Sequence, residues 1–554
     1  MRIDALPNLV RDGKRLHEVV STLARYGLAP WLEKANVGWV RKHLRAASGE
    51  QIGQLSQGAR LRLAMTELGT TFIKLGQILS TRPDLVGPEI TEELTKLQAN
   101  APADSPQMIR QMIESELGRT PDELFLEFDD EPAASASIGQ VHFATMKDGT
   151  PVVVKIQHSG IEGKIHSDME ILRILAELAE RYSSHARQLR PVDTLAELTR
   201  TLFAELDFTR ESRNLERFEH NFAQDQRVCF PKPYPTLSSA RVLTMDRLVG
   251  VGVGHRDELQ SLGYDLSDLA RRGANIFLEM IFRDGFYHAD PHPGNILALE
   301  DATIGLLDCG MVGRVDETFR EQFEDLLMAC AGNDAQAVCD TICEMGSVPP
   351  EMDPDALRGD LDDFLAEFGS QDLSHFDLGG VLNRMMAIIR RYSIILPTRL
   401  SLLIKVLVML EGTARDLSPT FSLGEILEPY KEKILRRRLA PGRLLKKARH
   451  SAADWSRLVE MAPRDLADIL TQVKRGRFEV HLEHRKLDSI ANRVVMGILS
   501  AALFVGSAMI WSRAVPPLLG GVPVFGVLGC LVAVFMGASL ARAIKRSGGN
   551  IELK

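Results

Sequence analysis

The sequence predicts an α+β protein with two lobes, preceded by a helical extension and followed by a helical hairpin that crosses a membrane. Three observations lead to this fold class. A β-branched strand with its turn marks a small lobe that contains a sheet, a polar motif of Asp and Asn residues lies in a longer helix-rich region, and two uncharged stretches lie near the C-terminus. With 554 residues, the chain is too long for one hydrophobic core.

Five regions are predicted along the chain. They are an N-terminal helical extension (1–120), a small lobe (121–249), a larger helical lobe (250–418), a basic helical segment (419–490) and two transmembrane helices (491–546). Thr244 to Arg247 is predicted to be the strand that links the two lobes. Met1 to Gly58 is predicted to form amphipathic helices without a chemical motif.

The composition is that of a folded enzyme. Apolar residues make up 45% and charged residues 25%, which excludes a disordered or fibrous class. The net charge of -8 gives no general attraction to nucleic acid. The six cysteines lack the spacing of a zinc site or a disulfide framework, so the soluble part is expected in a reducing compartment. No apolar run follows Met1, so no cleavable signal peptide is expected.

A helix with one apolar stripe is predicted ahead of the small lobe. The stripe consists of Met65, Leu68, Phe72, Leu75 and Leu79, at steps of three and four. Lys74 and Gln77 lie one turn apart beside it. On this pattern alone, a lysine that snorkels next to a core stripe is the favoured interpretation.

Small residues occupy the stretch before the predicted hairpin. Ala134, Ser135, Ala136 and Ser137 stand where a protein kinase has a glycine-rich loop, whose bare amides wrap the nucleotide phosphates. Because methyl groups and hydroxyls replace glycines here, nucleotide handling is expected to differ. The alternative is a strand edge of small residues packed against a helix.

A lysine stands in the predicted hairpin. Val152 to Gln157 follows the turn Asp148-Gly149 and is predicted to be the second strand. Lys155 stands where a kinase keeps its phosphate-binding lysine, which needs a carboxylate to hold it. Glu211, on a helix of mixed charge, is the candidate carboxylate. By spacing alone this pairing is weak, and an exposed strand lysine is the alternative.

The most informative motif has the spacing of a kinase-type phosphoryl-transfer site. Asp290 is followed five residues later by Asn295, and Asp308 comes thirteen residues after that. In such a site the first Asp orients or deprotonates the acceptor, while the Asn and the second Asp hold Mg²⁺ on the nucleotide phosphates. Oxygen ligands on two adjacent loops suit magnesium.

Two alternatives remain for this motif. One is a surface turn rich in Pro and Gly with incidental carboxylates. The other is a metal site formed by His288 and His292, which are four residues apart. Pro291 and Pro293 disfavour the helix that would place both imidazoles on one face.

Together these motifs resemble the UbiB family of atypical protein-kinase-like proteins, also called the AarF family. The resemblance covers roughly Arg60 to Arg546. The family's alanine-rich loop corresponds to Ala134 to Ser137, and Gln140 to His142 follows it. Its Lys-x-Gly-Gln signature is present as Lys74 to Gln77, and its Glu-x-Asp signature as Glu205 to Asp207.

The resemblance implies a bilobal protein-kinase-like fold and a role for each site residue. Lys155 is expected to pair with Glu211, and Asp290 to be the catalytic-loop Asp. Asn295 and Asp308 are expected to bind the metal. ATP and Mg²⁺ are therefore the expected cofactors.

The same resemblance places the helix of Lys74 and Gln77 over the active site, with Lys74 held by Glu205 and Asp207. These residues would then occupy the space where a protein substrate docks, which argues against ordinary protein kinase activity in trans. The departures from the family pattern are small: Ser135 interrupts the alanines, and Cys309 replaces the Phe of the Asp-Phe-Gly triplet.

Near the C-terminus, two stretches carry no charge and each can supply a membrane span of ~20 residues. They are Val494 to Trp511 and Ala514 to Ala541, the second starting as late as Val522 in one alternative. Basic residues flank the pair at both outer ends, namely Arg493, Arg542, Lys545 and Arg546. This pattern predicts both ends in the cytoplasm, with the catalytic domain at the cytoplasmic face of the cell inner membrane.

A basic segment, Lys431 to His450, precedes the first span. A nucleic-acid patch would need interleaved aromatic residues, which this segment lacks. Contact with the anionic cytoplasmic leaflet fits the neighbouring anchor better, and solvated charge is an equal alternative.

By resemblance, the chain is expected to support ubiquinone biosynthesis. The favoured mechanism is ATP hydrolysis coupled to handling of polyprenyl-phenol intermediates or to organising other ubiquinone biosynthesis proteins at the membrane, with no nucleic-acid partner. A nucleotide-binding pseudokinase scaffold and a true kinase of a protein or small molecule remain alternatives. A ring hydroxylase is disfavoured, because the sequence has no dinucleotide fingerprint, haem site or iron-carboxylate motif.

Overall fold

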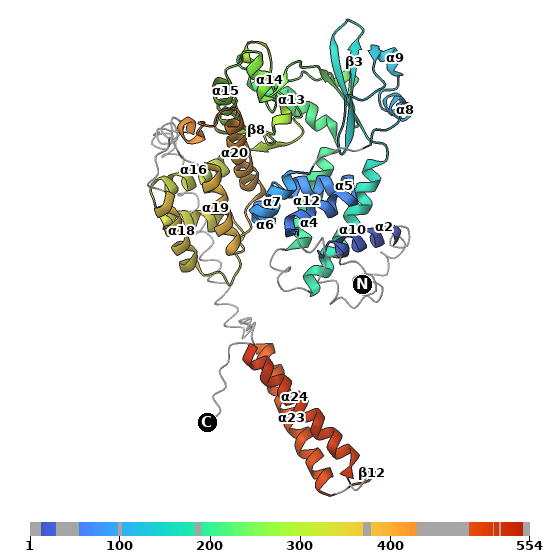
Figure 1. The fold of residues 1–554 in the computed structure, drawn as a ribbon, viewed down its shortest axis with the longest axis vertical. Coiled ribbons are helices and arrows are strands. Elements are labelled where there is room, and N and C mark those ends of the chain that lie inside the picture. The colour runs from blue at the N-terminus through green and yellow to red at the C-terminus, as the bar shows by residue number, and fades with distance from the viewer. Residues whose placement is uncertain are drawn as a thin grey trace, which may run out of the picture. The chain divides into compact units, whose positions relative to one another are not determined.

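The computed structural model describes residues 13–28, 55–97, 102–182, 190–368, 378–427, 430, 487–513, 515–519 and 522–546 (Figure 1). The chain forms two compact units, Met1–Ala440 and Pro441–Lys554, and each is described by itself. The predicted basic segment, Lys431 to His450, lies outside the described residues.

An antiparallel sheet forms the small lobe of the first unit. Its strands are β1 (Phe125–Phe128), β2 (Ala134–Ser135), β3 (Gly139–Met146), β4 (Pro151–Gln157) and β6 (Val242–Asp246). The order is β1-β3-β4-β6, and β2 pairs with β3. The predicted hairpin is confirmed: β3 pairs with β4, and Gly149 takes φ +88° in the turn between them. Only glycine adopts that conformation without strain.

One face of this sheet is covered by α8 (Pro106–Leu117), with α9 (Pro121–Leu124) leading into β1. Ile109 and Ile113 of α8 are fully buried against Val152, Val154 and Ile156 of β4. The alternation of β4 explains this packing, because residues 152, 154 and 156 face the helix, and Lys155 therefore faces the other side.

The N-terminal helices are α2 (Gly13–Arg25), α4 (Gln57–Leu68), α5 (Thr70–Leu79), α6 (Pro83–Val86) and α7 (Pro88–Thr95). The prediction of one continuous helix through the apolar stripe is wrong. Gly69 takes φ +89°, so α4 ends there and α5 begins. Met65, Leu68 and Phe72 of the stripe nevertheless pack in one core with Leu94 and Leu97, whereas Leu75 is buried in the main core.

In the described residues between β4 and β6, the chain forms three α-helices. They are α10 (Ile161–Tyr182), α12 (Pro191–Glu205) and α13 (Phe208–Asn221). Asp207 caps α13, since its side chain accepts a hydrogen bond from the Thr209 amide at 3.1 Å. The short step between α12 and α13 thus brings Glu205 and Glu211 to the same region of the lobe.

The large lobe combines short strands with helices. The strands are β5 (Val228–Cys229), β7 (Val251–Gly252), β8 (Phe286–His288), β9 (Ile296–Ala298), β10 (Ile304–Leu306) and β11 (Val312–Arg314). The α-helices are α14 (Arg256–Ser261), α15 (Leu266–Glu279), α16 (Glu317–Ala331), α17 (Ala335–Met345), α18 (Pro354–Phe368), α19 (Leu378–Arg391) and α20 (Thr398–Leu417). The short helical turns of this lobe are η5 (Met280–Asp284), η6 (Pro293–Asn295) and η7 (Glu300–Ala302), whereas η4 (Pro235–Leu237) packs against β6 of the small lobe. Helix α20 packs against α15, α19 and β11 (Figure 1).

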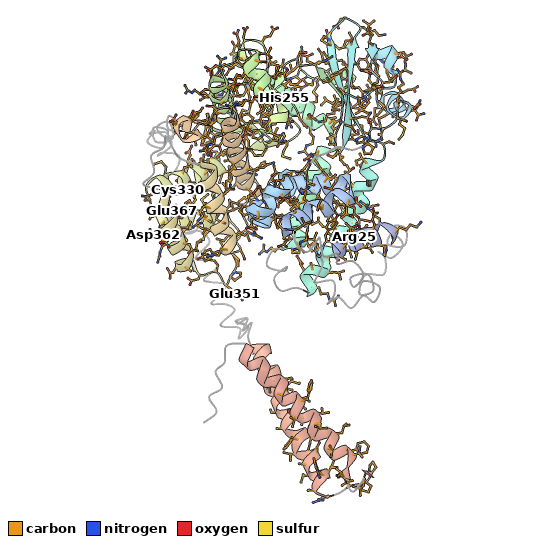
Figure 2. The ribbon with its side chains drawn as sticks, in the orientation of Figure 1. Arg25, His255, Cys330, Glu351, Asp362 and Glu367 are labelled. Carbon is orange, nitrogen blue, oxygen red and sulfur yellow. The ribbon has the colours of Figure 1, made fainter. Side chains whose placement is uncertain are left out.

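The described part of the second unit is a helix pair. It consists of α23 (Leu487–Ser512), β12 (Leu518–Leu519), β13 (Val522–Pro523) and α24 (Val524–Arg546). The two helices pack together, and Ser500 Oγ of α23 donates to the Ala533 carbonyl at 2.9 Å. Their side chains stand off the pair in Figure 2 and include exposed Leu, Val and Phe residues.

Among the described residues, one helix is long and apolar enough to cross a membrane, Val495–Ser512. The apolar part of α24, Val524–Leu540, is shorter. Its start agrees with the late alternative near Val522 rather than with Ala514. The second span and the cytoplasmic orientation stay predictions.

Candidate active site

Lys155 is held between two carboxylates. Its Nζ atom lies 2.8 Å from Glu211 Oε2 and 3.3 Å from Asp308 Oδ1. The Lys155 side chain is 12% exposed, so it is not the exposed strand lysine that was the alternative. It lies in the middle of the sheet, opposite Val141 of β3 and Leu243 of β6.

Helix α13 carries Glu211 and is tied to the loop that carries Asp308. The Asn214 side-chain amide, one turn after Glu211, donates to the Cys309 carbonyl at 2.9 Å. The Phe208 ring at the start of α13 lies 5.2 Å from Lys155 Nζ. These contacts fix the helix position, so the pairing of residues 56 apart in the sequence depends on tertiary structure.

The electrostatics of the three groups are strongly coupled. Burial opposes the charge of Lys155, but Asp308 and Glu211 outweigh it and raise the pKa of the lysine. Attraction by Lys155 holds the pKa of Asp308 well below its ordinary value, against the effect of burial. Burial raises the pKa of Glu211 to about 7, and Lys155 only partly offsets this.

Asp308 has a backbone conformation that is uncommon for its residue type. It follows β10 with φ +47°, in the left-handed region that Asp and Asn tolerate better than most residues. The Leu307 amide just before it donates to the Asn295 carbonyl at 2.8 Å. The pairing of β9 with β10 therefore brings Asn295 and Asp308, the two predicted metal ligands, to adjacent loops.

Asp290 and Asn295 are joined directly. The Asn295 side-chain amide donates to Asp290 Oδ2 at 3.0 Å and to its carbonyl at 3.2 Å. His288 Nδ1 accepts from the Asp290 amide at 3.2 Å, and its Nε2 donates to the Leu307 carbonyl at 2.9 Å. The loop of Asp290 is thus fixed to the segment that precedes Asp308.

The alternative metal site at His288 and His292 finds no support. His292 Nδ1 accepts from the Gly294 amide at 3.1 Å, so both imidazoles bond to backbone. The described residues contain no group of three His, Cys, Asp or Glu side chains that could hold a metal ion.

A magnesium ion fits the predicted pair. Asp308 is ionised because of its lowered pKa. Asn295 bonds to Asp290 through its nitrogen, which leaves its side-chain oxygen as the ligand. One carboxylate and one amide oxygen, completed by water and phosphate oxygens, are the ligands that magnesium takes from protein.

The small-residue loop is partly a strand. Ala134 and Ser135 form β2 and pair with β3, so these two residues belong to the sheet. The Ala136 carbonyl accepts a hydrogen bond from His158 Nε2 at 2.9 Å, and Ser137 is buried. The Ser135 hydroxyl is buried with no hydrogen-bond partner in the described part of the chain.

Helix α5 contributes a third charge pair. Lys74 forms an ion pair with Glu205 at the end of α12. Burial disfavours the Lys74 ammonium, but Glu205 outweighs it and the pKa of Lys74 is raised, with a further contribution from Asp308. Lys74 therefore lies within electrostatic reach of the Asp308 loop.

The two other residues of the paired signatures have different partners. The Asp207 carboxylate accepts hydrogen bonds from the Thr209 amide at 3.1 Å and from the Thr209 hydroxyl at 2.6 Å. Asp207 therefore caps helix α13, two residues after the Glu205 that pairs with Lys74. Gln77 donates to the Leu97 carbonyl at 3.2 Å, which ties α5 to the segment after α7. Gly76 packs so closely on Met65 and Leu97 that a Cβ there would collide with both.

Sequence reasoning missed Lys405 of α20, whose Nζ lies 3.7 Å from Asp290 Oδ1. The signal was present, because Lys405 is the lone charge in an apolar helical run from Leu400 to Leu410. A charged residue in a helix that is apolar all round is rarely buried without a partner.

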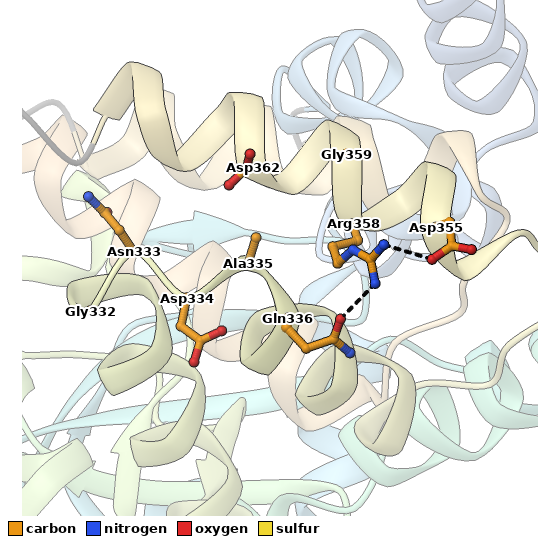
Figure 3. A pocket seen from close by; sticks show the side chains of 9 residues that line it. All are labelled: Gly332, Asn333, Asp334, Ala335, Gln336, Asp355, Arg358, Gly359 and Asp362. Carbon is orange, nitrogen blue, oxygen red and sulfur yellow. Dashed lines mark hydrogen bonds and ion pairs between the residues drawn. The ribbon is translucent and has the colours of Figure 1, made fainter.

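A cavity of about 610 Å³ lies elsewhere, between the α16–α17 turn and α18. Arg358 crosses it, donating to Gln336 Oε1 at 3.0 Å and pairing with Asp355 at 2.8 Å (Figure 3). None of the residues that line this cavity belongs to the Lys155 and Asp308 cluster.

Comparison with known proteins identifies the family to which this chain belongs. Three family models match: the ABC1 atypical kinase-like domain over residues 96–342, the UbiB helical domain over 361–422, and the ABC1/UbiB kinase-like C-terminal domain over 481–546. A Tolumonas auensis protein named "Probable protein kinase UbiB" is 31% identical over 526 residues, covering 91% of this chain and 94% of its own. The chain belongs to the UbiB family of atypical kinase-like proteins.

Further UbiB relatives carry the same name. The Pseudomonas aeruginosa protein is 36% identical over 423 residues, covering 76% of this chain and 79% of its own, and the Azotobacter vinelandii protein is 33% identical over 522 residues, covering 91% and 94%. The solved complex of Rv3197 with erythromycin, from Mycobacterium tuberculosis, is 26% identical with a TM-score of 0.46, covering 64% of this chain and 91% of its own. The family models and the UbiB relatives confirm the predicted UbiB resemblance and the kinase-like α+β fold.

Proposed function

We propose that the chain binds ATP with Mg²⁺ at the cluster of Lys155, Glu211 and Asp308 and transfers its terminal phosphoryl group. The observation that carries this proposal is the position of Lys155 Nζ, 2.8 Å from Glu211 and 3.3 Å from Asp308. In a kinase-type site the lysine binds phosphates, the helix carboxylate holds it, and the Asp of the next loop binds the metal.

Each remaining residue of the site has a proposed role. Asn295 and Asp308 hold the Mg²⁺, which supplies charge neutralisation on the phosphates when bound. Asp290 orients the acceptor or takes its proton. The loop of Ala134, Ser135, Ala136 and Ser137 covers the phosphates, and the unpartnered Ser135 hydroxyl is a donor available to them.

The acceptor is proposed to be water or a small molecule. Lys74 of helix α5 pairs with Glu205 and is close enough to Asp308 for that carboxylate to raise its pKa. We propose that Lys74, Gln77, Glu205 and Asp207 together restrict access and set nucleotide selectivity. A folded protein substrate would have to displace this helix, which disfavours protein phosphorylation in trans.

We further propose that the activity supports ubiquinone biosynthesis at the cell inner membrane. The support is membership of the UbiB family and the apolar helix Val495–Ser512. ATP hydrolysis would drive the handling of polyprenyl-phenol intermediates or organise other ubiquinone biosynthesis proteins. The five predicted regions (1–120, 121–249, 250–418, 419–490 and 491–546) are retained as the proposed domain organisation.

Phosphate release by the purified full-length chain tests this proposal. The protein would be assayed with ATP and Mg²⁺, with and without anionic vesicles, and with and without a phenolic quinone precursor. Stimulation by vesicles and precursor together supports coupled ATP hydrolysis. Nucleotide binding without any release would instead favour the scaffold, and a phosphorylated precursor would favour a small-molecule kinase.

A further inference from the structure

Lys405 is a buried cation that none of the site motifs includes. Its side chain is 11% exposed, and its neighbours in α20, namely Leu403, Ile404, Val406 and Leu407, are all buried. An ammonium at such a position loses hydration and needs an anion to compensate. The helix would pack at least as well with an apolar residue there, so the charge itself calls for an explanation.

The contacts of Lys405 do not occupy all the hydrogen-bond donors of its ammonium. Its ion pair in the described part of the chain is with Asp290 Oδ1 at 3.7 Å, which is longer than a hydrogen bond. Asp290 Oδ2 accepts instead from Asn295 at 3.0 Å. A lysine ammonium has three donors, so Lys405 can bind a second anion without losing Asp290.

Helix α20 holds Lys405 rigidly over the catalytic loop. One turn before it, Ser401 Oγ donates to Asp84 Oδ1 at 3.1 Å, inside a buried pair with Arg82. Two turns after it, Thr413 Oγ1 donates to the Pro291 carbonyl at 3.1 Å. The position of the ammonium beside Asp290 is therefore set by a helix fixed on both sides.

We propose that Lys405 binds the terminal phosphoryl group of the nucleotide next to Asp290. This inference rests on the proposed ATP site and adds the residue that recognises the γ-phosphate. Lys155 is already engaged by Glu211 and Asp308, at 2.8 and 3.3 Å. During transfer, the phosphoryl group spreads negative charge over its oxygens, and the Asp290 carboxylate adds a second negative charge on the acceptor side. A cation at this position would balance the charge of the phosphoryl group and that of Asp290.

ADP lacks the group that Lys405 binds, so the lysine distinguishes ATP from ADP. The test measures the affinities of ADP and a non-hydrolysable ATP analogue, with Mg²⁺, for the full-length chain in detergent. The variants are Lys405→Met, which suits the apolar helix, Lys405→Arg, which keeps the charge, and Lys232→Met, an exposed lysine as the matched control. A thermal melt of each variant verifies that it is folded.

Lys405→Met is expected to bind the ATP analogue about tenfold more weakly, the loss of one charge-assisted hydrogen bond, while ADP affinity stays within about twofold. Lys405→Arg should recover most of the loss, and Lys232→Met should match the wild type. An unchanged ratio of the two affinities in Lys405→Met, or an equal loss for both nucleotides, would overturn the inference alone. If the wild-type protein binds neither nucleotide, both the inference and the proposed function are overturned. Should Lys405→Met not fold, Lys405→Gln is judged by the same ratio.

Discussion

The ammonium of Lys155 lies 3.3 Å from Asp308 Oδ1, and this contact joins the sheet of the small lobe to a loop of the large lobe. A magnesium ion bound to Asp308 would compete with Lys155 for that oxygen. Metal and nucleotide binding are therefore expected to be coupled.

Asp290→Asn should separate binding from turnover. The amide keeps the size of the carboxylate but cannot accept a proton, so phosphate release should fall by about 10²–10⁴-fold while nucleotide affinity changes little. Steady-state phosphate release and equilibrium binding, both with Mg²⁺, measure the two effects. Asp257→Asn, at an exposed position of α14, is the control. Equal turnover in Asp290→Asn and wild type would favour the scaffold alternative.

Lys74→Ala should change which nucleotide the chain prefers. Lys74 pairs with Glu205 and is within electrostatic reach of Asp308, so its loss leaves a buried carboxylate uncompensated near the phosphates. Affinities for ATP and ADP, together with self-labelling, would be compared among wild type, Lys74→Ala and Ala136→Gly, which restores backbone freedom to the loop. If all three proteins behave alike, neither the helix nor the loop governs the site.

Glu211 provides a test by pH. Burial raises its pKa to about 7 from the ordinary 4.5, so the folded state binds this proton more tightly than the unfolded state does. The associated stability is present below about pH 4.5 and is lost as the pH rises through about 7. The difference in free energy of unfolding between wild type and Glu211→Gln should therefore decrease with rising pH, by about 1 kcal/mol per pH unit between the two values.

Thermal or denaturant unfolding at a series of pH values measures that difference. Glu216→Gln, on the exposed face of the same helix, should give a pH-independent difference from wild type. A difference between wild type and Glu211→Gln that stays constant from pH 5 to pH 8 would show that Glu211 is ionised throughout this range and would contradict the prediction.

Gly76→Ala should destabilise the N-terminal helices. A Cβ at this position would lie 2.7 Å from Met65 Sδ and would also collide with Leu97, and overpacking of this kind costs about 1–3 kcal/mol. The matched control is Gly163→Ala in α10, where a Cβ meets nothing within 4 Å and helix propensity favours alanine. A lower melting temperature is expected for the first variant only, and equal melting temperatures would contradict the packing argument.

The local sequence pattern was sufficient to predict the elements whose structure depends on residues close together in the sequence. The hairpin with Lys155 follows from a β-branched run after Asp148-Gly149, and the Asp290, Asn295 and Asp308 spacing indicates two adjacent loops. The break at Gly69 was missed because the apolar spacing continues across it, and only the positive φ ends the helix.

Contacts between distant segments were beyond reach of the sequence pattern alone. Lys405 approaches Asp290 across 115 positions only because α20 is fixed to the loop of Asp290. Asp207 was expected to hold Lys74 together with Glu205, and the sequence pattern did not indicate its second role as the cap of α13, where it accepts a hydrogen bond from the Thr209 amide. Glu211 was the correct partner of Lys155 by resemblance, while spacing by itself gave only weak support.

The central claim is that Asp308 holds the metal that binds ATP, and titration of ATP with and without Mg²⁺ tests it most directly. Asp308→Asn keeps the side-chain shape and tolerates φ +47° equally well, so the fold should persist. Wild type should bind ATP more tightly with Mg²⁺ than without, and Asp308→Asn should lose that difference, whereas Asp257→Asn should keep it. Unchanged Mg²⁺-dependent affinity in Asp308→Asn would contradict the account.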